Sequence, residues 1–279
     1  MLQQGFVQAP YSPSIFWHPG RDLRTLVHGG DFMTSGNRTN ARRFRNVLQS
    51  RFEIKAVVVG SGVEECAEGR MLGRSIRITP EGWEYEADPR HAEMILRDYN
   101  RLHANGVKSP GTAPSVHEEE ENGELFRGIE ITQFRAPAAG ANYLAQDRSD
   151  LQFAAKEVCR GMAEPTVGHQ RALRPLARYL VAHPRVVWHF PWQEEEGSVN
   201  AVSDGDWAGC RKTAKSTSGG VLTRGSHCLR TYSVPQKSAT LSSVEAELVA
   251  LVRCASEAIG ITQLAQVAQV FIDSSAALH

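Results

Sequence analysis

Residues 199–222 read VNAVSDGDWAGCRKTAKSTSGGVL, and this stretch decides the fold of the C-terminal part of the chain. Its apolar runs, at 199–203 and 220–222, predict two strands separated by glycine-rich turns, and residues 228–232 predict a third. A long helix is expected from about Ser242, because Ser242 to Glu245 fits a capping box. The pattern therefore indicates an antiparallel sheet with a helix packed on it, an α+β or α/β layer.

The helix and the residues after it predict the rest of this layer. Leu248, Val252, Ala255 and Ile259 recur at helical spacing, so we expect them to form the buried face of the helix. Residues 270–272 are Val-Phe-Ile and predict a short fourth strand that delivers Asp273.

Three acidic residues lie where these strands and the helix are expected to meet: Asp204, Glu247 and Asp273. If the fourth strand pairs beside the first, the three carboxylates can converge at one end of the sheet. Clustered carboxylates repel one another, and hard divalent cations such as Mg²⁺ relieve that repulsion. Two such ions about 4 Å apart can stabilise both oxygens of a phosphodiester displacement. Any αβ domain has acids at its strand ends, so a purely structural role also stays open.

Three ordered motifs carry a resemblance to a known family. Residues 203–209 (SDGDWAG) with 215–220 (KSTSGG), 241–251 (LSSVEAELVAL) and 273–277 (DSSAA) resemble the SDADWAG…RSTSGY, ALSSTEAEYMAL and DNQSA motifs of copia-type ribonuclease H. The resemblance implies that Asp204, Glu247 and Asp273 hold two Mg²⁺ ions, for which Mn²⁺ can substitute. It also implies hydrolysis of the RNA strand of an RNA–DNA hybrid. Asp206 and Glu245 match the motifs too, and we expect them to be solvated or capping acids.

The resemblance extends upstream to the reverse transcriptase of the same Pol polyproteins. Residues 140–155 (GANYLAQDRSDLQFAA) and 165–180 resemble the segments that join polymerase to nuclease. Residues 5–31 are similar to the polymerase palm, whose motif needs two adjacent acids. Here Gly30 stands at the first position and leaves Asp31 alone, and the partner aspartate would precede Met1. A single carboxylate cannot organise a two-metal polymerase site, so we expect polymerase activity to be lost. Because the family continues beyond the point where this chain stops, we also expect weak or no nuclease activity.

The expected organisation has four parts. A partial reverse-transcriptase palm covers 1–103, a linker rich in Gly, Pro, Ser and Glu covers 104–126, a helical connection covers 127–195, and a truncated ribonuclease H-like domain covers 196–279. Within them we expect strands at 14–17 and 55–59, hairpins at 23–34 and 76–85, helices at 40–52, from Pro89 to about Asn100 and through most of 138–183, and a connector at 184–197.

Composition limits the classes of protein considered. Apolar residues make up 41% of the chain and charged residues 22%, which is normal for a folded protein, and no apolar run is long enough for a membrane helix. The five cysteines are odd in number and never form CxxC, which favours free thiols in a reducing compartment, the cytoplasm or nucleus. Net charge is zero, yet residues 209–240 are locally basic. We expect phosphate contacts from Arg211, Lys212, Lys215 and Lys237.

Alternatives from other classes stay open. The chain could be a non-catalytic relic that at most binds nucleic acid, or an interaction module built on residues 138–183. Gly60-Ser61-Gly62 could begin a dinucleotide loop, but the third glycine is missing and a plain turn is favoured. Trp188, Trp192 and Trp207 could stack on bases, although core packing is the commoner fate and is expected for at least two of them.

Overall fold

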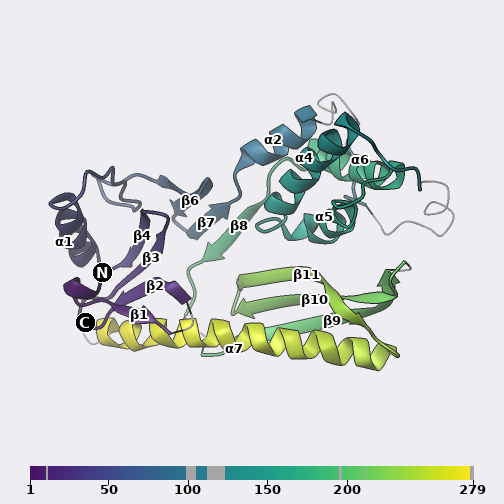
Figure 1. The fold of residues 1–279 in the computed structure, drawn as a ribbon. Coiled ribbons are helices and arrows are strands. Elements are labelled where there is room, and N and C mark those ends of the chain that lie inside the picture. Colours follow the sequence, from purple (N-terminus) through teal and green to yellow (C-terminus); the bar gives the residue numbers. More distant parts are fainter. Residues whose placement is uncertain (11, 99–104, 112–122, 195–196, 211, 277–279) are drawn as a thin grey trace. The chain divides into compact units, whose positions relative to one another are not determined.

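The computed structural model describes the chain except for residues 11, 99–104, 112–122, 195–196, 211 and 277–279, and of residues 265–276 it describes the backbone alone. The chain divides into two compact units, one made of Met1–Met71 with Ser256–His279 and the other of Leu72–Ala255. The mixture of helices and antiparallel sheets confirms an α+β protein (Figure 1). The domain boundaries expected from the motifs stay predictions.

The first unit begins with the short 3-10 helix Leu2–Gln4 and an antiparallel sheet of four strands in chain order, β1 (Val7–Ala9), β2 (Ser12–His18), β3 (Leu23–His28) and β4 (Asp31–Gly36). Helix α1 (Arg38–Gln49) begins at Asn37, whose side chain accepts hydrogen bonds from two backbone N–H groups of the first turn. Its Phe44 packs on Phe6 with ring centroids 4.8 Å apart, and Leu23 completes this small core. The expected strand, hairpin and helix of this region are confirmed.

The strand expected at residues 55–59 was wrong. These described residues form no strand, and Val59 makes only a single parallel bridge with Cys66. The Glu65 carboxylate accepts a hydrogen bond from the backbone N–H of Gly62 and forms an ion pair with Arg38 of α1. These contacts hold residues 60–66 as a loop. The turn expected at Gly60 to Gly62 is confirmed, because no helix begins after it. The unit then reaches β5 (Glu68–Met71).

The second unit opens with β6 (Arg74–Thr79) and β7 (Gly82–Glu86), the expected hairpin, and β8 (Val187–Pro191) pairs antiparallel with β7. Residues 184–197 were therefore wrongly expected to be a connector throughout. The bulky side chains of Trp188 and Phe190 lie opposite Tyr85 and Trp83, so the pairing partner comes from a segment about a hundred residues earlier. Periodicity within five residues cannot reveal such a partner.

Four helices form the main hydrophobic core of this unit: α2 (Pro89–Asp98), α4 (Ile129–Leu144), α5 (Gln152–Cys159) and α6 (Val167–Ala182), with the 3-10 turn Ser149–Leu151 before α5. Thr166 caps α6 and forms a capping box with His169. Arg148 is fully buried, where its guanidinium pairs with Asp150 and donates to the carbonyls of His183 and Pro184. The helical region expected at 138–183 is confirmed.

The described ends of the expected linker are held against α6. Arg178 donates to the carbonyl of Asn105 over 2.8 Å, and Gly106 lies against Ala182. At the other end, the backbone N–H of Phe126 donates to the carbonyl of Pro165. The predicted linker residues 112–122 lie outside the described residues.

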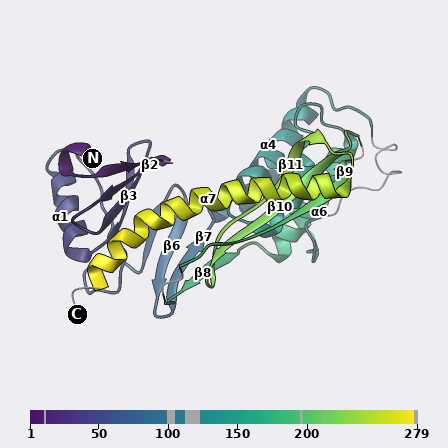
Figure 2. The same cartoon turned by 90° about the horizontal axis from the view of Figure 1, so that it is seen from below.

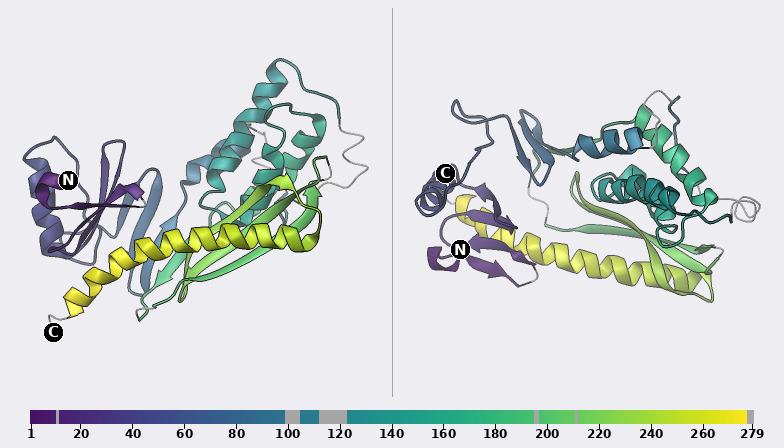
Figure 3. Two further views of the ribbon diagram at one scale, coloured as in Figure 1. Left: turned by 60° about the horizontal axis from the view of Figure 1, so that its bottom comes forward. Right: turned by 45° about the horizontal axis from the view of Figure 1, so that its top comes forward.

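The last three strands of the unit form a separate antiparallel sheet in the order β11-β10-β9, with β9 (Asn200–Cys210), β10 (Lys215–Arg224) and β11 (His227–Ala239). All three predicted strands are confirmed and are longer than expected. The first turns of α7 (Ser243–Ala276) lie along one face of this sheet (Figure 1, Figure 2), and α5 lies on the other (Figure 1). Figure 3 shows the same order of layers from two further sides.

Candidate metal and nucleic-acid site

The start of α7 is fixed as the sequence predicted. The Ser242 hydroxyl accepts a hydrogen bond from the backbone N–H of Glu245 over 3.2 Å, and the Glu245 carboxylate accepts one from Leu241 over 2.7 Å. Glu245 therefore acts as a capping acid, which confirms that prediction. Glu247 follows two residues later and is exposed.

Small side chains, not the expected aliphatic ones, form the buried face of α7. Ala246, Ala250 and Cys254 are buried at four-residue spacing, whereas Leu248 is 57% exposed and Val252 59%. The cause lies in the sheet. Gln236 of β11 donates to the carbonyl of Ala246 over 2.8 Å, so the helix backbone itself touches the sheet and leaves no room for leucine. The expected buried face of Leu248, Val252, Ala255 and Ile259 was therefore wrong, since all four residues are exposed.

Gly205 is a point of close approach between β9 and α7. A Cβ atom at Gly205 would lie 2.8 Å from the carbonyl oxygen of Ala246 and 3.2 Å from the backbone nitrogen of Glu247. The backbones next to Asp204 and at Glu247 are therefore in contact. Since successive side chains of a strand alternate between faces, Asp204 projects from the face opposite to α7.

The third predicted ligand is placed differently from the expectation. Residues 270–273 belong to α7, which runs to Ala276, so the expected fourth strand was wrong. Residues 261–273 offer no proline or glycine to end the helix, and alanine, leucine and glutamine in this segment continue it. Asp273 falls in the first unit, and its side chain is outside the described ones. Among the residues that the structure describes, no three His, Cys, Asp or Glu side chains gather closely enough to hold a metal ion.

Asp206 has a structural role, as expected. Its carboxylate accepts a hydrogen bond from the backbone N–H of Thr217 across the β9–β10 pair. The Thr217 hydroxyl in turn accepts one from Lys156 of α5 over 2.7 Å, and Lys156 also pairs with Glu157. The link between α5 and the sheet passes through these residues, and no motif pointed to Lys156.

The residues expected to contact phosphate lie around the same sheet. Lys215 begins β10 and is half-buried, while Lys212 and Lys237 are exposed. Arg211 lies outside the described residues. By strand alternation Lys237 projects from the face opposite to that of Gln236, which contacts α7. Lys237 and Asp204 therefore point from the same face of the sheet.

Gly30 and Asp31, which were expected to be a degenerate polymerase motif, lie in a tight hairpin turn of the first unit. Gly29 and Gly30 join β3 to β4 with φ values of 57° and 104°. Asp31 is the first residue of β4, lies opposite His28 of β3 in the strand register, and is exposed. The positive φ of Gly30 favours glycine at the position where the palm motif carries an acid.

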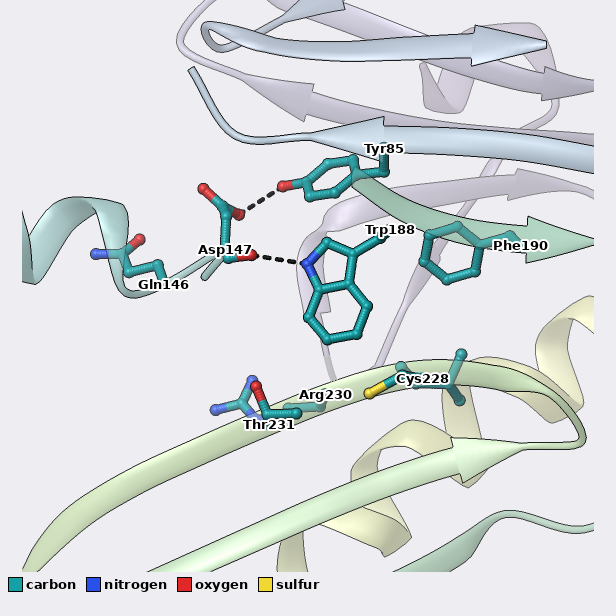
Figure 4. A pocket seen from close by; sticks show the side chains of 9 residues that line it. Tyr85, Gln146, Asp147, Trp188, Phe190, Cys228, Arg230 and Thr231 are labelled. Carbon is teal, nitrogen blue, oxygen red and sulfur yellow. Dashed lines mark hydrogen bonds between the residues drawn. The ribbon is translucent and has the colours of Figure 1, made fainter. Parts of the chain in front are cut away.

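A pocket of about 250 Å³ lies within the second unit, and sequence reasoning did not predict it. Its lining comes from the turn after α4, from β7 and β8, and from β11: Tyr85, Gln146, Asp147, Trp188, Phe190, Cys228, Leu229, Arg230 and Thr231. Figure 4 shows Trp188 between Asp147 and the strand that carries Cys228 and Thr231. Trp188 was one of three tryptophans weighed for base stacking. The expectation of core packing for two of the three was wrong, because Trp192 is 59% and Trp207 55% exposed.

Comparison with known proteins agrees with the motifs. The chain is 29% identical to the retrovirus-related Pol polyprotein from transposon RE2 of Arabidopsis thaliana over 266 residues, which are 92% of the chain. It is also 29% identical, over 265 residues, to the Pol polyprotein from transposon RE1 of the same plant. The chain is therefore a homologue of copia-type, retrovirus-related Pol polyproteins. It spans 17% of the length of each of these two relatives.

The Pol-related chain is also 27% identical over 188 residues to an uncharacterised mitochondrial protein of Arabidopsis thaliana, which covers 67% of the chain and 75% of that protein. No protein-family model and no solved structure matches it. All five cysteines are free thiols, as expected. Within the described part of the chain, no helix is long and apolar enough to cross a membrane.

Proposed function

We propose that the Pol-related chain is a reverse transcriptase and ribonuclease H segment in which residues 196–279 hydrolyse the RNA strand of RNA–DNA hybrids, while polymerase activity is lost. The contact of Gly205 with the backbone at Ala246 and Glu247 is the observation that supports the proposal most. Because of this contact, the segment of β9 next to Asp204 lies beside the turn of α7 that carries Glu247.

The donor chemistry of these residues fits a hard divalent cation. Asp204 and Glu247 are exposed carboxylates, the oxygen ligands that Mg²⁺ prefers. Asp204 and Glu247 would hold the ion. A bound Mg²⁺ or Mn²⁺ would polarise the scissile phosphodiester.

Charge on the same face of the sheet supports binding of a nucleic-acid strand. Lys237 shares that face with Asp204, and Lys212 is exposed in the β9–β10 turn. Lysines of this kind bind phosphates by charge, so affinity for hybrid falls as salt rises. Loss of polymerase activity follows from the lone Asp31 beside Gly30, since two-metal chemistry needs more than one carboxylate.

A non-catalytic, nucleic-acid-binding role is the second candidate. Two observations favour it: Asp204 projects from the face opposite to α7, and the described residues include no group of three metal-ligating side chains. In that case Lys212, Lys215 and Lys237 bind the hybrid and no cleavage follows.

Cleavage of a hybrid carrying a labelled RNA strand, in Mg²⁺ or Mn²⁺, distinguishes the two. We expect cutting that Asp204→Asn and Glu247→Gln abolish and that the matched control Asp98→Asn, an exposed acid on α2, leaves unchanged. Salt-dependent binding by a folded sample that never cuts would select the second candidate. Absence of both binding and cleavage would contradict both.

A further inference from the structure

Helix α1 of the first unit carries positive charge that the proposed function does not use. Its sequence, RTNARRFRNVLQ, contains four arginines and no acidic residue. Arg38 lies in the first turn, where the positive end of the helix dipole favours acidic side chains over basic ones. Like charges three or four residues apart on a helix also repel one another. The charge of α1 therefore needs another explanation than the stability of the helix.

Three of the four arginines form one row along α1. Arg38, Arg42 and Arg45 follow one another at spacings of four and three residues, so their side chains lie on the same side of the helix. We call these three residues the arginine stripe. With 3.6 residues per turn, Arg43 projects on the other side of the helix, about 160° away from Arg45.

A buried carboxylate fixes two arginines of the stripe. Glu65, whose side chain is only 2% exposed, lies 2.9 Å from Nε and 3.0 Å from one Nη atom of Arg38, and 3.5 Å from Arg42. A Cβ atom at Gly60 or Gly62 would collide with this carboxylate, so the loop closes tightly around it. Glu65 occupies two of the five N–H donors of Arg38, whose side chain remains 57% exposed. Its guanidinium is thus held in place and can still donate to a ligand.

The arginine stripe keeps a net positive charge. Glu65 balances one of its three arginines. Glu64 is 84% exposed and lies 3.8 Å from Arg42, where solvent screens the pair. Arg45 forms no ion pair with any residue that the structure describes, and its Nε atom is buried without a hydrogen-bond partner. An anion bound along the stripe would supply the acceptor that Arg45 lacks.

We propose that the arginine stripe of α1 binds consecutive phosphates of a nucleic-acid strand. At about 1.5 Å per residue, Arg38 to Arg45 span about 10 Å of helix, and one strand of a duplex carries a phosphate about every 3.4 Å. The stripe therefore matches about three phosphates, a regular spacing that an acidic protein segment does not offer. Guanidinium groups in fixed orientations suit phosphate oxygens, which they contact through paired N–H donors. The proposal rests on the first unit alone and not on the cleavage proposed for residues 196–279.

Fluorescence anisotropy of the full chain with a labelled RNA–DNA hybrid, at a series of salt concentrations, tests the stripe. Arg45→Gln removes one charge and leaves the pairs of Glu65 intact. We expect weaker binding and a salt dependence reduced by about one phosphate contact. Between about 50 mM and about 200 mM salt, one contact corresponds to about 3.5-fold in affinity, so the wild type should weaken by that much more than the variant.

Arg43→Gln is the matched control, because it removes the same charge from the other side of the same helix. Its salt dependence should stay close to that of the wild type. An equal loss in Arg43→Gln and Arg45→Gln would show that only the net charge matters and would overturn the stripe. Absence of hybrid binding by the folded wild type would overturn it as well.

Glu64→Gln gives a test of the opposite sign, which unfolding of a variant cannot mimic. Removal of the exposed carboxylate beside Arg42 should raise the affinity for hybrid. Arg45→Lys keeps the charge at the stripe and should retain most of the salt dependence. Unchanged affinity in both Glu64→Gln and Arg45→Gln would contradict the proposal.

Two comparisons separate this proposal from its neighbours. Labelled poly-glutamate should bind more weakly than hybrid; equal affinity with the same dependence on Arg45 would replace the nucleic acid by an acidic protein segment. A chain that never cuts, yet loses salt dependence in Arg45→Gln, contradicts the proposed function and supports the stripe. A chain that cuts hybrid and binds it equally well as wild type and as Arg45→Gln supports the proposed function and overturns the stripe.

Discussion

Replacing Gly205 by alanine tests how closely α7 packs on β9. The new methyl group would lie 2.8 Å from the carbonyl oxygen of Ala246 and 3.2 Å from the nitrogen of Glu247. Both are backbone atoms of a helix that also receives a hydrogen bond from Gln236, so neither can move aside without shifting the helix. Overpacking of this kind costs about 1–3 kcal/mol.

The size of the effect follows from the unit that holds the contact. For a domain of the size of Leu72–Ala255, a loss of 1 kcal/mol lowers the melting temperature by about 2–4 °C. A cost of about 2 kcal/mol therefore corresponds to a decrease of about 4–8 °C in Gly205→Ala. Denaturant unfolding followed by circular dichroism gives the free energy, and hybrid cleavage or binding gives the effect on the candidate site.

Gly219→Ala is the matched control on the neighbouring strand. Its methyl group would meet only the carbonyl oxygen of Asp204, at an ordinary 3.8 Å. Alanine is favoured over glycine in a strand by about 0.5–1 kcal/mol, so this variant should be neutral or slightly more stable than the wild type. Equal stability of the two variants would refute the close contact between β9 and α7.

Two other predictions concern an ion pair and a turn. Hydrogen bonds from Arg185 and Arg77 lower the pKa of buried Glu86 from 4.5 to about 2. The ionised Glu86 therefore stabilises the folded chain by about 3 kcal/mol. This contribution is present above pH 4.5 and is lost as the pH falls toward 2. Urea unfolding between pH 7 and pH 2.5 should show this loss in the wild type and not in Glu86→Gln; a parallel decline in both would exclude Glu86 as its source. Gly30→Asp, which restores the missing acid, should destabilise the chain by about 1 kcal/mol because the φ angle of Gly30 is 104°. Gly20→Asp is the control: Gly20 lies in a nearby turn without positive φ, so this variant should not be destabilised. Unfolding curves that rank the two turn variants the other way would contradict the argument.

Local sequence determined the elements whose stabilising contacts are short-range. The β3–β4 hairpin follows from Gly29-Gly30 between two apolar runs, because the turn needs positive φ at both positions. The start of α7 follows from the Ser242 cap, whose bonds lie within four residues. The motifs at residues 203–209 and 241–251 likewise identified the Pol family from sequence.

Only the tertiary structure decided features that depend on distant partners. The buried face of α7 could not be read from its aliphatic periodicity, because the requirement for alanine at Ala246 and Ala250 comes from the sheet that the helix approaches. Residues of β8 form a strand because they pair antiparallel with β7, which lies about a hundred residues earlier in the chain. The Trp188 pocket exists because the turn after α4, β8 and β11 meet there, and no local pattern in any of the three encodes that meeting.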